Sequence, residues 1–128
     1  MMPGESSIEA ALALARQLFD TIGTRTFDGV GFTRAAYGEG EQTAHDLVAA
    51  AARDLDLDIA VDAALNLSMT LRGDDPDLPP LVIGSHLDAV PQGGNFDGLA
   101  GVLAGLACLA AYRAAGVRPP RDIVLIAI

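Results

Sequence analysis

Apolar residues recur at intervals of three and four in two stretches of the chain, and this spacing predicts two amphipathic helices. The first covers about residues 7–21, with Ser6 as the N-cap and Glu9 completing a capping box. The second covers about residues 41–54. Between them, residues 24–37 contain several glycines and show no clear period, so we expect an irregular connection there.

The period changes to two in residues 57–61 and again in residues 65–71, where apolar and polar side chains alternate. This alternation predicts a β-hairpin whose turn lies around residues 62–64 and whose strands are half-buried. Residues 73–80 follow as GDDPDLPP, a composition typical of a loop.

The last third of the chain predicts a strand, a helix and another strand. Leu81–Ser85 is a short apolar run that predicts a buried parallel strand, and residues 97–115 form a long apolar helical stretch with Gly116 as its C-cap. Residues 122–128 predict a second buried strand. Together these elements predict an α/β fold, the N-terminal part of a mostly parallel sheet sandwiched by helices, with a hairpin, in the order α-α-β-β-β-α-β.

Composition and charge restrict the possible partners. The chain has 128 residues, of which 51% are hydrophobic, enough for one domain with a core. Its net charge is −9, from 17 acidic residues against eight arginines and no lysine. Because no basic patch is available to neutralise phosphates, we expect neither nucleic acid nor an anionic membrane as a partner.

Two further features bear on location and redox chemistry. The N-terminus lacks the cationic segment of a signal peptide, and the longest apolar run, residues 99–112, is too short to span a membrane. We therefore expect a cytoplasmic protein. The single cysteine, Cys108, lies in the apolar helical stretch, where we expect it to be a small buried hydrophobe.

Three residues with metal-binding chemistry follow the strand Leu81–Ser85. His86 and Asp88 are two residues apart, so in extended backbone their side chains point to the same side. A histidine can bind a metal through one ring nitrogen while a carboxylate orients the ring through the other. Asp97 starts the following helix, where the helix dipole favours an ionised carboxylate. The pattern is consistent with a metal site, or with hydrogen-bonded polar residues that cap the sheet. The other histidine, His45, lies off the apolar face of its helix, and we expect it at the surface.

The run that contains these residues, GSHLDAVPQGGNFDGLAGVLAGL, resembles the metal-binding signature of one branch of the zinc aminoacylase/carboxypeptidase metallohydrolase family. This is the amidase/hydantoinase/carbamoylase branch, which includes N-carbamoyl-L-amino-acid hydrolases and allantoate amidohydrolases. The upstream segments GFTRAAYGEGEQTAHDLV and VDAALNL are similar as well, so the resemblance covers about residues 31–128.

The resemblance implies a role for each of the three residues. His86 would be a ligand of one metal ion, Asp97 would bridge two metal ions, and Asp88 would hold His86 and serve catalysis in that way. The cofactors would be two divalent ions, zinc or alternatively manganese, cobalt or nickel. The resemblance also implies a cis peptide bond between Asp97 and Gly98.

The activity implied is hydrolysis of a linear amide C–N bond in a small molecule of the N-carbamoyl amino acid, ureido or allantoate type. A related di-metal aminopeptidase or carboxypeptidase, and a non-catalytic truncated remnant or interaction module, remain alternatives. Residues 1–128 are expected to be a partial catalytic domain, inactive alone, that lacks the general base, further ligands and the domain through which the complete protein would form a homodimer. Two departures from the family pattern are Ala89 in place of threonine and Leu65 in place of the glycine before Asn66.

Overall fold

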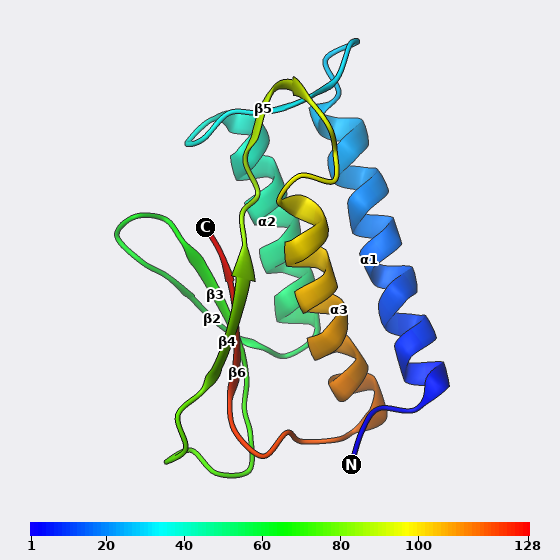
Figure 1. Ribbon diagram of the computed structural model, residues 1–128, viewed down its shortest axis with the longest axis vertical. Coiled ribbons are helices and arrows are strands. Elements are labelled where there is room, and N and C mark those ends of the chain that lie inside the picture. Colours follow the sequence, from blue (N-terminus) through cyan, green and yellow to red (C-terminus); the bar gives the residue numbers. More distant parts are fainter.

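The computed structural model describes all residues, 1–128, as three helices beside a four-stranded sheet, with a small two-stranded sheet at one end (Figure 1). In chain order the elements are α1 (Glu5–Thr26), β1 (Phe32–Arg34), α2 (Glu39–Asp54), β2 (Asp58–Val61), β3 (Leu67–Leu71), β4 (Leu81–Ser85), β5 (Ala89–Gly93), α3 (Leu99–Ala115) and β6 (Ile123–Ala127).

The larger sheet has the strand order β2-β3-β6-β4. Strand β4 runs parallel to β6, with Leu81 opposite Ile123 and Ser85 opposite Ala127, and α3 connects the two strands. The predicted strand-helix-strand unit is therefore confirmed. The hairpin is also confirmed, because β2 and β3 pair antiparallel from Asp58 opposite Thr70 to Val61 opposite Leu67.

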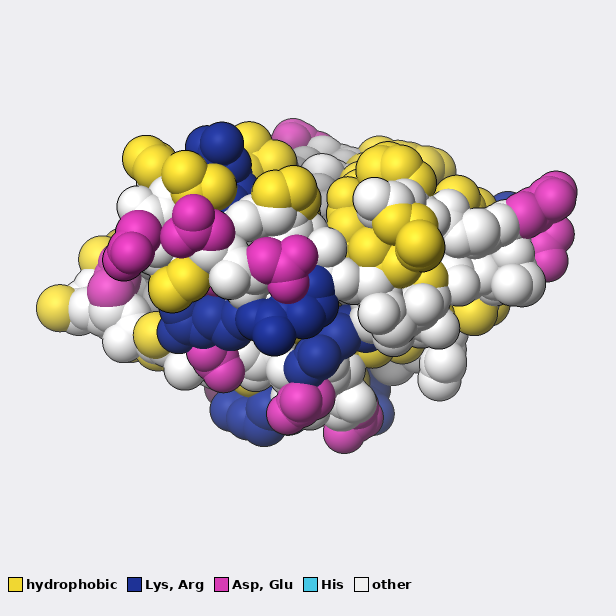
Figure 2. Space-filling view, turned by 90° about the horizontal axis from the view of Figure 1, so that it is seen from below, with side chains coloured by type: hydrophobic (Ala, Val, Ile, Leu, Met, Phe, Trp, Pro, Cys, Tyr) yellow, Lys and Arg dark blue, Asp and Glu magenta, His cyan; other side chains and the backbone are white.

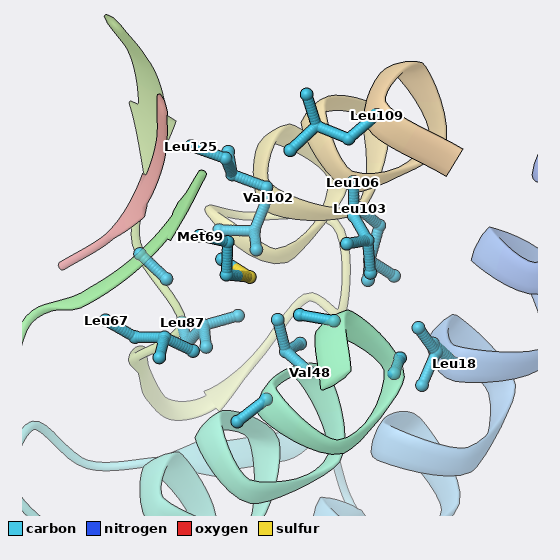
Figure 3. Packing of buried hydrophobic residues seen from close by; sticks show 14 of the residues in the cluster. Leu18, Val48, Leu67, Met69, Leu87, Val102, Leu103, Leu106, Leu109 and Leu125 are labelled. Atoms are coloured by element: carbon cyan, nitrogen blue, oxygen red, sulfur yellow. The ribbon is translucent and has the colours of Figure 1, made fainter. Parts of the chain in front are cut away.

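The helices form layers on one face of this sheet. Helices α2 and α3 pack against the strands, and α1 packs against α3 on the side away from the sheet (Figure 1). Alternate residues of β3 and β6 point into the core between sheet and helices. Figure 3 shows side chains from all these elements meeting there: Leu18, Val48, Leu67, Met69, Leu87, Val102, Leu103, Leu106, Leu109 and Leu125.

The α/β class is confirmed, but the sheet differs from the predicted one in two respects. Only the β4–β6 pairing is parallel, because the antiparallel hairpin strand β3 lies beside β6. The helices cover one face, and β4 lies at the edge of the sheet, where the side chains of Leu81 and Val82 are 52% and 55% exposed. The prediction that β4 is buried was therefore wrong: an apolar run does not distinguish a central strand from an edge strand.

Three local predictions need correction. Helix α1 begins after Gly4, which makes no side-chain cap, so the capping box at Ser6 does not form. The stretch expected to be irregular contains β1. Cys108 was expected to be buried but is exposed, because it lies with Ala104 on a narrow exposed stripe of α3. The residues of this stripe are small and apolar, so the sequence alone does not distinguish them from core residues. None of the helices combines the length and apolarity needed to cross a membrane.

Candidate metal site

The loop between β4 and α3 carries the three residues singled out by the sequence. Its first residues continue the sheet, because Ile128 donates its backbone N–H to Ser85 O at 2.9 Å and Leu87 donates to Ile128 O at 3.3 Å. The Leu87 side chain is fully buried and points into the core (Figure 3). Its neighbours His86 and Asp88 therefore point away from the core, so one apolar anchor sets the direction of both polar side chains.

His86 lies between the two aspartates. Its Nδ1 is 2.9 Å from Asp88 Oδ1 and 3.1 Å from the Asp88 carbonyl oxygen, and its Nε2 is 3.4 Å from Asp97 Oδ1. If Nδ1 carries the proton and donates it to Asp88, then Nε2 presents a lone pair toward the Asp97 carboxylate. Two acceptors that face each other in this way need a cation between them, either a metal ion or the proton of an imidazolium.

The spacing of these two donors fits a single metal ion. Ligands about 2.0–2.1 Å from a tetrahedral zinc ion are roughly 3.3 Å apart, and His86 Nε2 and Asp97 Oδ1 are 3.4 Å apart. The three side chains are partly exposed, 41% for His86, 39% for Asp88 and 65% for Asp97. No group of three or more His, Cys, Asp or Glu residues is arranged to hold a metal ion. The chain therefore offers two donors of suitable chemistry and spacing.

Gly98 allows this close arrangement. Its φ is +69°, and a Cβ at this position would overlap both Nδ1 and the carbonyl oxygen of His86. Any side chain here would therefore displace the imidazole or the start of α3. The peptide bond between Asp97 and Gly98 is not cis, contrary to the expectation, since the chain contains no cis peptide.

A buried arginine, which the sequence analysis did not identify, supports the loop. Arg34, the last residue of β1, has a fully buried side chain. Its Nε donates to Leu87 O at 2.9 Å, one amino nitrogen donates to Asn95 Oδ1 at 2.7 Å and to Thr26 Oγ1 at 3.2 Å, and the other donates to Asn95 O at 3.4 Å. Arg34 thus holds both the start and the end of the loop.

The electrostatic environment of Arg34 is unusual. Burial lowers the pKa of its guanidinium, and the charges of Asp88 and Asp97 raise that pKa in return. No carboxylate lies in direct contact with Arg34, so its hydrogen bonds go to neutral oxygens. The only hint in the sequence was the position of Arg34 within the segment GFTRAAYGEGEQTAHDLV. Spacing alone did not identify a partner 53 residues away.

A cavity of about 310 Å³ lies beside Asp88. It is bordered by one side of α2, the turn of the β2–β3 hairpin and Ile128, and His45 and Leu65 are among its lining residues. His45 is half-buried rather than a simple surface residue, and burial lowers the pKa of its imidazole while Glu41 and Asp46 raise it. His45 therefore faces the same cavity as Asp88.

Comparison with known proteins finds several relatives, although no family model matches the chain. Over 97 residues the chain is 40% identical to an N-carbamoyl-L-amino acid amidohydrolase of Geobacillus stearothermophilus, a match that covers 76% of this chain and 24% of that protein. Over 94 residues it is 31% identical to a ureidoglycolate hydrolase of Arabidopsis thaliana, covering 73% of this chain and 20% of that protein.

The structure agrees with these sequence matches. A crystal structure of a hydantoinase/carbamoylase family amidase from Burkholderia ambifaria superposes with a TM-score of 0.82 at 35% identity, covering 91% of this chain and 29% of that chain. The chain spans about a quarter of the length of the relatives it matches. Its sequence and fold together place the chain in the hydantoinase/carbamoylase family of amidases, where it matches the N-terminal part of the known members.

Proposed function

We propose that this chain supplies part of the metal site of an amidohydrolase that acts on small linear amides of the N-carbamoyl amino acid or ureido type. The names of the relatives support this substrate class, because they include an N-carbamoyl-L-amino acid amidohydrolase and a ureidoglycolate hydrolase. The position of His86 between Asp88 and Asp97 is the observation that carries the proposal.

Each residue has a distinct role in this proposal. Asp88 accepts the Nδ1 proton of His86 and so keeps the Nε2 lone pair available and correctly oriented. His86 Nε2 and Asp97 would hold the divalent ions, zinc or alternatively manganese, cobalt or nickel. Two divalent ions held there would polarise the substrate carbonyl and lower the pKa of a bound water.

Two protein donors hold a metal ion weakly compared with the three or four of a typical site. We therefore expect the 128-residue chain to bind divalent ions but to hydrolyse no N-carbamoyl amino acid. A di-metal aminopeptidase or carboxypeptidase could use the same histidine and aspartates, and the names of the sequence relatives favour the amidohydrolase. A module without catalysis would keep His86 beside Asp88 and Asp97 as a hydrogen-bonded polar cap of the sheet.

Paramagnetic NMR of the chain tests the metal site. The chain contains only His45 and His86, so its imidazole C–H region holds two sets of signals that can be followed separately. Addition of Mn²⁺ should broaden the His86 signals at concentrations that leave His45 sharp. The same selectivity should extend to the backbone amides of Asp97 and Gly98.

Matched variants decide the assignment. His86→Ala should abolish the selective broadening of the Asp97 and Gly98 amides, and Asp97→Asn that of the His86 ring, whereas His45→Ala should leave the broadening of His86 intact. Equal broadening of both histidines, or none at either, would exclude His86 as a metal ligand. It would leave a hydrogen-bonded polar cap of the sheet as the explanation of the geometry.

A further inference from the structure

We propose that Arg34 is a positioning residue that fixes the separation of His86 and Asp97 and thereby sets the metal affinity of the pair. This inference rests on the proposed function, because it assigns Arg34 a part in the same site. Arg34 touches neither of these side chains. It acts through the backbone of the loop that carries them.

The contacts of Arg34 lie at the two places that determine this separation. Leu87, whose carbonyl oxygen accepts the Nε proton, directly follows His86 in the chain. Asn95, whose side-chain and backbone oxygens accept from the two amino groups, comes two residues before Asp97. One rigid, planar guanidinium therefore joins both ends of the loop, and it limits how far His86 and Asp97 can move apart.

The hydrogen-bond network of Arg34 is itself anchored to α1. Asn95 donates its side-chain amide to Phe19 O at 3.2 Å, so the residue that receives Arg34 is also bound to the helix. Thr26, in the last turn of α1, accepts from Arg34 and donates its hydroxyl to Ile22 O at 2.8 Å. Every oxygen in this network therefore has a defined partner in a buried setting, which restricts the loop to one arrangement.

Burying Arg34 costs free energy, which indicates that the forked geometry of its guanidinium is needed to hold the loop. A charged group buried without an opposite charge in contact is expensive even when it is hydrogen-bonded. A lysine has the same charge, but its three donors share one nitrogen, so it lacks the spread with which three guanidinium nitrogens reach Leu87 O and the two Asn95 oxygens. A smaller apolar residue would leave those oxygens without partners.

Mn²⁺ titration of folded variants tests the proposal, because the apparent Mn²⁺ affinity of a folded variant does not depend on its stability alone. The measured quantity is the Mn²⁺ concentration that half-broadens the His86 ring signals, with the folded fraction of each variant confirmed by circular dichroism. Arg34→Lys and Asn95→Ala should each raise this concentration about tenfold, the usual effect of removing a group that orients a metal ligand. Arg34→Met should raise it further if the variant folds.

Arg113→Met is the matched control. Arg113, near the end of α3, donates its Nε to Leu55 O at 2.8 Å and contacts Asp56, so it too ties a loop through backbone oxygens, but away from the metal loop. This variant should bind Mn²⁺ as the unaltered chain does. If Arg34→Lys and Asn95→Ala fold and keep the original Mn²⁺ concentration, Arg34 is a purely structural residue and the inference is wrong. If the unaltered chain shows no selective broadening at His86, the proposed metal site itself fails.

Discussion

The charged side chains at the two ends of the sheet differ in burial and in pairing. At one end, here called the loop end, lie Arg34, His86, Asp88 and Asp97. At the other end, here called the arginine end, three exposed arginines each form an ion pair with at least one aspartate. The pairs are Arg72 with Asp58 and Asp122, Arg113 with Asp56, and Arg118 with Asp74. Figure 2, viewed from below Figure 1, shows basic side chains with acidic neighbours.

The contrast shows which charges are available for binding. Arg72 is 62% exposed and lies 2.6 Å from Asp58 and 2.7 Å from Asp122, so one surface arginine engages both carboxylates. At the loop end the cation is buried and bound to neutral oxygens, while Asp88 and Asp97 lie partly exposed around His86. The loop end therefore keeps carboxylates free of arginine partners, and the arginine end does not.

Backbone strain is also concentrated at the loop end. Four residues other than glycine have a positive φ: Tyr37, Asp56, Leu65 and Gln92. Tyr37 and Leu65 line the cavity beside Asp88, and Gln92 lies in β5, whereas Asp56 belongs to the arginine end. Sparsely populated backbone conformations cluster at functional sites, where the surrounding structure maintains them. This distribution supports the loop end as the site.

Removing an arginine from each end should give the largest contrast. Arg34→Met leaves several buried oxygens without donors, and we expect a loss of about 3 kcal/mol in the free energy of unfolding. Arg72→Met removes the ion pairs of an exposed arginine with Asp58 and Asp122, and we expect only a small fraction of that loss. Urea denaturation followed by circular dichroism measures both. Equal losses would show that the two ends do not differ in the way their charges are held.

The glycines at the two ends of α3 offer a second comparison. Gly98 and Gly116 have similar φ values of +69° and +64°, but a Cβ on Gly116 would meet nothing, whereas one on Gly98 would overlap His86. Gly116→Ala should cost about 1 kcal/mol from backbone strain alone. Gly98→Ala should cost about 3 kcal/mol, because Gly98, with ψ −53°, lies outside the left-handed region that Gly116 occupies with ψ 25°, and because the new Cβ would overlap His86. Thermal unfolding distinguishes these values, and similar losses would mean that the loop yields easily around His86.

The sequence predicted those helices and strands whose apolar residues recur at a regular spacing. Strands β4 and β6 and helix α3 have apolar patterns long enough to read, and their order implies the parallel pairing. Strands β1 and β5 were missed because β1 has three residues and β5 contains Pro91 and Gly93, which weaken a strand pattern.

The candidate site divides in the same way. His86, Asp88 and Asp97 lie within one short segment, so their spacing and the family resemblance identified them, and their metal-binding roles remain a prediction. Arg34 and Asn95 are 61 residues apart in the chain, and only the folded structure brings them together. A buried arginine has no local signature, because its burial depends on which distant oxygens surround it.

Leu65 gives the smallest expected effect and the most direct test of strain at the loop end. Its φ is +69° and it is 55% exposed, so little packing compensates for the conformation. Leu65→Gly should relieve about 1–2 kcal/mol of backbone strain and lose about 0.5–1 kcal/mol through greater freedom of the unfolded chain.

The net expectation for Leu65→Gly is a gain of up to about 1.5 kcal/mol in the free energy of unfolding, seen as a higher urea midpoint. Leu65→Ala is the control, because it shortens the side chain but keeps the unfavourable φ, so it should bring no such gain. Asp56→Gly, at the arginine end, should also bring none, because aspartate tolerates this conformation and the substitution removes the contact with Arg113. A gain at Asp56 equal to that at Leu65 would show that strain is not specific to the loop end.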